Sequence, residues 1–305
     1  MRADECPPVL LVVFNRPGVT TRALTALREV APPVLFIAAD GPRVDVSTDE
    51  ANCAEVRRIT REIDWPCEVF RLEHETNIGL QASMCAAIDW FFDSVDRGVI
   101  LEDDCVCHPD FFRLARHVLD EYADDPSVAY LTAVNMAPKR TYGDGSYFFA
   151  SGGHIWGWGS WRRAWRGHRA VLEDWPLHRP RVVAIDNPLK RPLIIKGDEA
   201  YGGKKRSWSR LWHLAVLASA ASVIVPSENL VVNVGFGPDA THTVSSRHTL
   251  FGLQTTGLDA PFRKPSDRTP SRAYDRRLLR YHSGPLKRRV RRRLQYIWRG
   301  HQSNS

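Results

Sequence analysis

Three adjacent acids, Glu102, Asp103 and Asp104, directly follow a short apolar run at residues 98–101. Like charges at this spacing repel one another, and the low dielectric at the end of a buried strand further disfavours each carboxylate. A divalent cation would remove that cost, because Mg²⁺ and Mn²⁺ prefer hard carboxylate oxygens as ligands. The triplet could equally be an acidic turn that caps the following helix, with Asp104 near its positive N-terminus. The residues alone leave both interpretations open.

Other polar side chains stand at the ends of three earlier apolar runs. If those runs are parallel strands of one sheet, their carboxyl ends meet at the same edge. The acids and these polar groups would then surround a single binding site. The polar residues at the three ends are Asn15, Arg16, Asp40 and Asn77.

The elements that must position these residues alternate regularly over the first 135 positions. Apolar, β-rich runs predict strands, and amphipathic spacing between Gly and Pro signals predicts helices. Apolar strands separated by helices are typical of a parallel, doubly wound α/β sheet. The predicted strands are residues 9–14, 34–39, 67–72, 98–101 and 128–134, and the predicted helices are residues 20–30, 48–63, 80–92 and 109–122.

The charge of the 305-residue chain is distributed unevenly around its net value of +7. Residues 263–305 carry 14 Lys and Arg against two Asp, a net charge of +12 that leaves −5 for residues 1–262. The first part is long enough to bury a core, and the second begins as a Pro-, Ser- and Arg-rich linker. The composition excludes disordered, collagen-like and coiled-coil classes.

The end of the basic tail has an amphipathic pattern. In residues 285–299, apolar side chains recur at the spacing of one helix face, and basic side chains fill the rest. This pattern fits an anionic membrane surface better than nucleic acid, whose phosphates require no apolar stripe. A solvated, partly disordered tail is the alternative. The apolar positions are Leu286, Val290, Leu294 and Ile297.

The cysteine spacing and the first residues of the sequence indicate the cellular compartment in which the protein is expected. The six cysteines lack Cys-x-x-Cys pairs, and the first residues lack a basic region followed by an apolar one. No apolar run approaches the ~20 residues that a membrane-spanning helix needs. We therefore expect a reduced, cytoplasmic protein, peripheral at the inner face of the plasma membrane if the tail binds lipid.

Several motifs together give the sequence a resemblance to a known family. In their order along the chain they are Phe14-Asn15-Arg16-Pro17, Ala39-Asp40-Gly41, Thr76-Asn77-Ile78-Gly79-Leu80, Leu101-Glu102-Asp103-Asp104, the Trp-rich run at 156–165, and residues 233–243. This set resembles bacterial glycosyltransferases of the GT-A type, similar to family 2, and the acid triplet is similar to that of the N-acetylglucosaminyltransferase I group. The resemblance implies a GT-A fold, with residues 9–135 as the nucleotide-binding half and 136–262 as the acceptor half.

The resemblance also implies roles for individual residues. Asn15 and Arg16 would lie near the nucleotide, Asp40 would accept hydrogen bonds from the uracil or ribose, and Asn77 would lie beside the base. Glu102 and Asp103 would lie near the ribose and the water shell of the metal ion. Asp104 would bind Mn²⁺ or Mg²⁺, and His242 matches a histidine that often completes the metal site. His242 could also be a plain surface residue.

The Trp-rich run resembles the acceptor side of the family. Flat aromatic rings suit the apolar face of a sugar, and Gly157 and Gly159 would let the backbone approach closely. Core packing is the alternative, which we expect for Trp161 and Trp165. We assign Trp156 and Trp158 to the acceptor pocket.

The sequence departs from the family pattern at Ser209, where similar sequences have an Asp at the start of the helix predicted for residues 208–220. That acid is a natural general base for an inverting transfer, and a serine cannot replace it unaided. Asp198 and Glu199 are the nearest acids upstream, and a flexible loop could bring one of them to the acceptor. The alternative is a solvated turn.

The sequence therefore predicts a metal-dependent transferase that moves a sugar from a UDP- or GDP-linked donor to a hydroxyl of a glycan or a lipid-linked glycan. Surface-glycan synthesis is the setting that the resemblance implies. Two alternatives stay open: a catalytically impaired, membrane-tethered binder of nucleotide sugars or glycans, and a sugar nucleotidyltransferase. The second normally needs a Gly-rich N-terminal loop, and residues 14–18 contain only one Gly.

Overall fold

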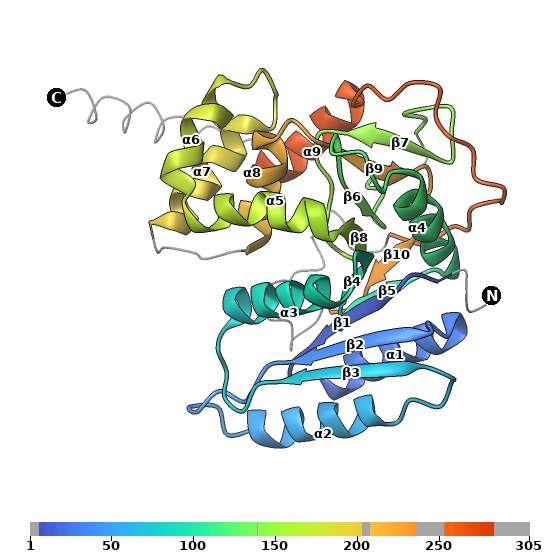
Figure 1. Cartoon of the computed structure of the whole chain (residues 1–305), viewed down its shortest axis with the longest axis vertical. Coiled ribbons are helices and arrows are strands. Elements are labelled where there is room, and N and C mark those ends of the chain that lie inside the picture. The colour runs from blue at the N-terminus through green and yellow to red at the C-terminus, as the bar shows by residue number, and fades with distance from the viewer. Residues whose placement is uncertain (1–5, 139, 203–207, 236–252, 284–305) are drawn as a thin grey trace.

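The computed structural model describes residues 6–138, 140–202, 208–235 and 253–283. The first half alternates strands and helices as the sequence predicts (Figure 1). Its elements are β1 (Val9–Val13), α1 (Pro17–Val30), β2 (Val34–Ala39), α2 (Asp49–Arg61), β3 (Glu68–Glu73), α3 (Leu80–Ser94), β4 (Arg97–Glu102), β5 (Cys105–Cys107), α4 (Pro109–Glu121) and β6 (Val128–Thr132).

The second half adds short strands and a group of helices. Its elements are β7 (Tyr147–Ala150), β8 (Trp158–Trp161), α5 (Arg162–Glu173), α6 (Trp175–Ala184), α7 (Lys190–Tyr201), α8 (Trp208–Ala218), β9 (Ser222–Pro226), β10 (Val231–Asn233) and α9 (Arg272–Ser283). Strands β5, β7, β8 and β10 were not predicted from the sequence.

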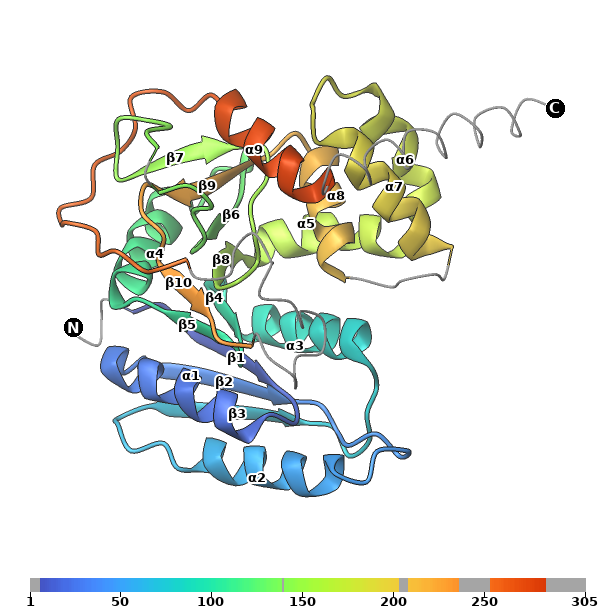
Figure 2. The same cartoon turned by 180° about the vertical axis from the view of Figure 1, so that it is seen from behind.

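One mixed sheet organises the chain, with the strand order β3-β2-β1-β4-β8-β6-β9-β7. Strands β8 and β7 run antiparallel to their neighbours, and the other strands share one direction. Helix α1 contacts α2 and α4, whereas α3 contacts α5 and α8, so helices cover both faces (Figures 1 and 2). This Rossmann-like arrangement confirms the predicted α/β class.

The central strand β1 shows why the sequence forms this sheet. All five of its apolar residues are buried, and the strand pairs in parallel with β2 on one side and β4 on the other. The register aligns Val13 with Ala39, and Val12 with Glu102. The carboxyl ends of β1, β2 and β4 therefore meet at one edge, where the polar residues of the candidate site begin.

A two-stranded ribbon crosses this edge. Strand β10 pairs antiparallel with β5, which aligns Asn233 with Cys105, and the Val234 N–H donates to the Asp104 carbonyl at 2.8 Å. This pairing brings residues 233–235 against the acid triplet, far away in sequence.

Tryptophans of the second half form the core between the sheet and the helices. Trp158 in β8 is 1% exposed, and its ring centroid lies 5.5 Å from that of Trp212. Trp165 lies 5.3 Å from Trp212, and Trp208 lies 6.1 Å from Trp158. These four tryptophans therefore pack against one another in the core.

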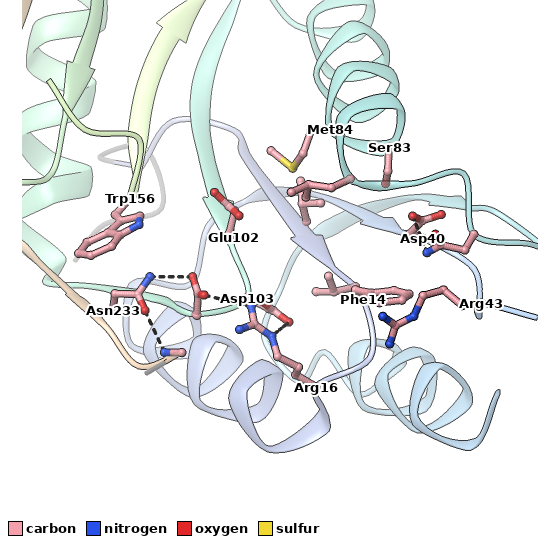
Figure 3. Close-up of a pocket in the computed structure, with 16 residues that line it drawn as sticks. Phe14, Arg16, Asp40, Arg43, Ser83, Met84, Glu102, Asp103, Trp156 and Asn233 are labelled. Atoms are coloured by element: carbon pink, nitrogen blue, oxygen red, sulfur yellow. Dashed lines mark hydrogen bonds and ion pairs between the residues drawn. The ribbon is translucent and has the colours of Figure 1, made fainter. Parts of the chain in front are cut away.

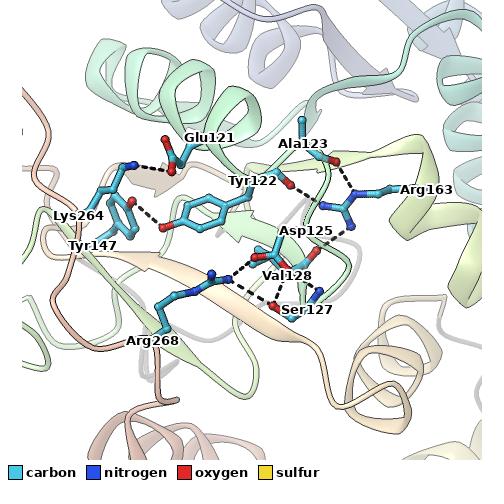
Figure 4. A network of polar contacts seen from close by, with 10 residues as sticks. All are labelled: Glu121, Tyr122, Ala123, Asp125, Ser127, Val128, Tyr147, Arg163, Lys264 and Arg268. Carbon is cyan, nitrogen blue, oxygen red and sulfur yellow. Dashed lines mark hydrogen bonds and ion pairs between the residues drawn. The ribbon is translucent and has the colours of Figure 1, made fainter.

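The start of the basic tail differs from the linker that its composition suggests. Residues 263–283 pack on the body, and Tyr274 in α9 is fully buried. Lys264 forms an ion pair with Glu121, and Arg268 forms one with Asp125 (Figure 4). In the body, Arg163 holds the same turn by donating to the carbonyls of Tyr122, Ala123 and Val128. The amphipathic segment at 285–299 lies outside the described residues. Within the described ranges, no helix is both long and apolar enough to cross a bilayer.

Candidate functional site

A cavity of about 320 Å³ opens at the carboxyl ends of β1, β2 and β4 (Figure 3). The first turns of α3 and the end of β10 complete its walls. This is the edge at which sheets of parallel strands bind ligands, and the volume suits a small molecule. Seven of the residues selected from the sequence line it: Arg16, Asp40, Asn77, Glu102, Asp103, Asp104 and Trp156.

The acid triplet at the end of β4 shares a single guanidinium group. Arg16 donates to both oxygens of Asp103, and its Nη2 lies 3.0 Å from Asp104 Oδ2. Glu102 points into the cavity, and its carboxylate has no hydrogen bond partner in the described part of the chain. One cation therefore compensates three carboxylates.

The pKa values of these acids express that imbalance. Burial raises the pKa of Glu102 to about 8, and the neighbouring charges of Asp104 and Asp103 add to the effect. Burial also raises the pKa of Asp103, to about 6, although Arg16 partly offsets the shift. Each shift reflects a charged form that lacks sufficient stabilisation, so the site favours an added cation.

The ribbon formed by β5 and β10 fixes Asp104 from the other side. Asn233 donates from Nδ2 to Asp104 Oδ1 at 3.0 Å and accepts from the Gly235 N–H at 2.9 Å. A Cβ on Gly235 would lie 2.4 Å from Asp104 Oδ2, so only glycine fits without displacing the acid. The backbone thus approaches the acid as closely as sterics allow.

At the opposite side of the cavity, Asp40 organises the ends of β2 and β3. Its Oδ1 accepts from the backbone N–H groups of Gly41 at 2.9 Å and Ile78 at 3.0 Å, and Oδ2 accepts from Asn77 Nδ2 at 2.9 Å. Asn77 also donates to the Gly41 carbonyl at 3.1 Å. The pair is a rigid polar wall that offers further lone pairs and an amide oxygen to a planar ligand.

An aromatic and a cationic side chain lie between these two walls. Phe14 and Arg43 both line the cavity, with the guanidinium carbon 5.4 Å from the ring centroid. Arg43 is held by Asp49, whose pKa falls to about 2, chiefly because of the Arg43 hydrogen bonds. Asn15 donates to the same Asp49 at 2.7 Å and does not line the cavity. Asn15 therefore supports Arg43 through Asp49, outside the cavity lining.

The two tryptophans assigned to the acceptor side separate. Trp156 lines the cavity beside Asn233 (Figure 3), and its ring centroid lies 5.9 Å from that of His154. Trp158 belongs to β8 and is buried in the core. Its ring packs against Trp208 and Trp212 and does not line the cavity, so the structure places Trp158 in the core and not in the acceptor pocket.

The two candidate bases do not reach this cavity. Asp198 and Glu199 belong to α7, where Asp198 accepts from Trp175 Nε1 at 2.9 Å and pairs with Arg179. The expected flexible loop is a helix, and the Asp198 carboxylate already has partners within the helical group. Ser209 lies in the first turn of α8, beside the buried Trp208, and does not line the cavity either.

The donor set suits a divalent cation only in part. No three His, Cys, Asp or Glu side chains of the described residues converge as a complete metal site, and His242 lies outside those residues. Asp103 and Asp104 offer carboxylate oxygens that Arg16 now occupies. Mg²⁺ commonly uses only one or two protein carboxylates together with substrate phosphates and water. The site therefore fits an ion that arrives with a phosphorylated ligand.

Several lining residues were not selected from the sequence. Arg43 follows the Asp40-Gly41-Pro42 turn, and Asn233 opens a stretch already noted for its resemblance, so both had a local signal. Ser83 and Met84 had none, because only the packing of α3 brings them to the cavity.

No family model matches the sequence, and no curated protein matches it either. Among solved structures, UDP-glucose pyrophosphorylase complexed with UDP-glucose aligns at a TM-score of 0.37 and 10% identity, over 72% of this chain and 90% of that one. HddC from Yersinia pseudotuberculosis aligns at a TM-score of 0.31 and 7% identity, over 52% of this chain and 77% of that one. Likenesses this low carry no argument about the activity of this chain.

Proposed function

We propose that this protein is a metal-dependent glycosyltransferase whose donor is a nucleoside diphosphate sugar. One observation carries the proposal: a single cavity joins the rigid Asp40 and Asn77 wall to the under-compensated acids Glu102, Asp103 and Asp104. The first wall suits the edge of a base or ribose. The second needs positive charge, which a metal ion bound to a diphosphate supplies.

In this proposal Asp104 and Asp103 hold the ion, with the diphosphate oxygens as its other ligands. A bound Mn²⁺ or Mg²⁺ supplies Lewis-acid stabilisation of the charge that develops on the leaving diphosphate. Asn233 keeps Asp104 in place through its 3.0 Å hydrogen bond. Arg16 then exchanges its contacts with the acids for contacts with phosphate oxygens, which suit a guanidinium fork.

The sugar would lie toward Trp156, whose ring offers a flat apolar face. Glu102 points into the cavity between Trp156 and Met84. Its unpartnered carboxylate makes it the candidate in this cavity for accepting the acceptor's proton, in place of Asp198 and Glu199. In that step the acceptor oxygen would bond to the anomeric carbon as the bond from that carbon to the diphosphate oxygen breaks.

Product analysis tests this function. The protein is incubated with Mn²⁺, a panel of UDP- and GDP-sugars and a mixture of glycan acceptors, and the release of UDP or GDP is measured. A parallel reaction contains UTP or GTP with sugar 1-phosphates, and pyrophosphate is measured. We expect release of a nucleoside diphosphate in the first reaction. Pyrophosphate in the second reaction alone would identify a nucleotidyltransferase and reject the proposal.

A non-catalytic binder of nucleotide sugars is the second candidate. The observation that favours it is the engagement of Asp198 by Arg179 and Trp175, together with Ser209 at the position of the family acid. Donor binding without turnover over the full panel, unchanged by Glu102→Gln, would support the binder.

A further inference from the structure

Helix α9 presents a row of arginines to solvent. Arg272, Arg276 and Arg280 are exposed and recur every four residues, which places them along one face of the helix. None of the three has an ion pair or hydrogen bond with any residue that the structure describes. Like charges at this spacing repel one another, so the helix keeps an electrostatic cost that a polyanionic surface would remove.

The opposite face of α9 is anchored. Tyr274 and Leu278 are buried, and the Tyr274 hydroxyl donates to the Val134 carbonyl at 3.4 Å. The one acid of the helix, Asp275, also faces inward, where it accepts from the Ser151 N–H at 3.0 Å and the Ser151 hydroxyl at 2.6 Å. The exposed positive charges are therefore neither neutralised within α9 nor free to move away from the body.

The sequence after this helix continues the same charge. Seven Lys and Arg and no acid follow Ser283, the last residue of α9. The apolar positions of residues 285–299 recur among these cations, with Tyr296 and Trp298 beside them. A lipid bilayer uses both components, whereas the phosphates of a nucleic acid use only the charge.

The C-terminal end of α9 lies beside the cavity wall. The Tyr281 ring centroid is 4.6 Å from that of His154, which in turn is 5.9 Å from that of Trp156. Figure 2 shows α9 crossing the second half of the molecule between β9 and α8. The arginine row lies on the opposite face of α9 from Tyr281, so a surface docked on the row would leave this contact with the cavity wall in place.

We propose that the Arg272, Arg276 and Arg280 face of α9 docks on an anionic phospholipid bilayer. This docking goes beyond the proposed function and does not depend on it. The docking uses residues of the folded body and adds to whatever the downstream segment contributes.

Vesicle binding by the full chain tests this proposal. Affinities are measured for phosphatidylcholine vesicles with and without phosphatidylglycerol, and for a short DNA duplex. The variant Arg276→Gln/Arg280→Gln is compared with Arg22→Gln/Arg181→Gln, which removes two exposed arginines from α1 and α6. We expect binding only to the anionic vesicles, weakened about tenfold or more by the α9 variant and less than about twofold by the control.

Four results would overturn the proposal: no binding to anionic vesicles, no loss in the α9 variant, equal losses in both variants, or tighter binding to DNA than to the vesicles. Nucleotide binding is measured on the same proteins without lipid. Because that measurement is independent of the vesicles, a failure of docking is distinguishable from a failure of the donor site.

Discussion

The carboxylate of Asp125 and the carboxylates at the cavity differ in how far their negative charge is compensated by neighbouring groups. At the turn between α4 and β6, Asp125 accepts from the Ser127 N–H, the Ser127 hydroxyl and Arg268 (Figure 4). Burial would raise its pKa, but these hydrogen bonds outweigh burial and lower it. At the cavity, Arg16 binds Asp103 and Asp104, Asn233 binds Asp104, and the Glu102 carboxylate has no hydrogen bond partner among the described residues. The pKa values of Glu102 and Asp103 are raised.

The difference separates an acid whose charge is compensated within the chain from acids whose charge is only partly compensated. Asp125 binds Arg268 and so holds the segment after residue 263 against the body, and the hydrogen bonds of its carboxylate come from Ser127 and Arg268. The cavity acids are held in place by the β5 and β10 ribbon although their charge is not fully compensated. Charge that the fold maintains but does not neutralise is the physical mark of a binding site.

The largest expected effect comes from removing one cavity acid. Asp104→Asn should weaken Mn²⁺-dependent binding of a nucleoside diphosphate at least about 100-fold, because even partners outside the first coordination shell contribute 10-fold to 100-fold. The variant should fold normally, since it also removes a repulsion within the triplet. Calorimetric titration measures the affinity. If Asp104→Asn bound the nucleoside diphosphate in Mn²⁺ as tightly as the wild type, Asp104 would not be a ligand-binding acid.

Asp125→Ala should have the converse effect. The variant loses three solvent-exposed hydrogen bonds to Ser127 and Arg268, so the free energy of unfolding should fall by about 0.5–1.5 kcal/mol. Nucleotide affinity should stay at the wild-type value. Denaturant unfolding and the same titration check the two parts, and a loss of nucleotide affinity at native stability would contradict the structural role.

The pH dependence of stability should also distinguish the two groups. An acid whose pKa is raised in the folded state stabilises the protein fully below its unfolded pKa, and that stability is lost as pH rises through the folded pKa. Without metal, Glu102 and Asp103 should therefore cost stability between pH 4 and about 8. In Glu102→Gln the decline should be smaller by at least about 1.4 kcal/mol, the equivalent of one pKa unit. Unfolding curves in chelator at several pH values measure it, and an identical decline in both proteins would contradict the shift.

A smaller effect is expected where the ribbon meets Asp104. Gly235→Ala would place a Cβ 2.4 Å from Asp104 Oδ2 and 2.9 Å from Arg16 Nη1, so the acid or the arginine must move. Nucleotide affinity should fall by about 1 kcal/mol. The matched control is Gly18→Ala in α1, where a Cβ has open space. Equal affinities of both variants would show that the close approach does not position Asp104.

The parallel half of the fold was predictable because its signals are local. Each apolar run from β1 to β4 is bounded by turn residues, and the polar residues at the ends follow from strand direction alone. Asp40, Asn77 and the triplet therefore reached the cavity as expected. Strand β8 was not predictable in this way, because its four residues form a strand only between β4 and β6. Trp158 was misassigned for that reason.

The start of the tail was misjudged by composition. The Pro, Ser and Arg content suggested a linker, but Tyr274, Leu278 and Tyr281 recur at the spacing of one helix face. That stripe was a local signal of the buried side of α9. The positions of Asp198 and Glu199 depended instead on the packing of α7 against α6 and α8, for which the sequence offers no short-range pattern.

The central claim is that the cavity acids bind a nucleoside diphosphate through a divalent cation. Isothermal titration of UDP and of GDP into the wild-type protein, in Mn²⁺ and in chelator, tests it most directly. We expect saturable binding of at least one nucleotide in Mn²⁺, weakened at least about tenfold in chelator. Binding of neither nucleotide, or equal affinity with and without the ion, would contradict it.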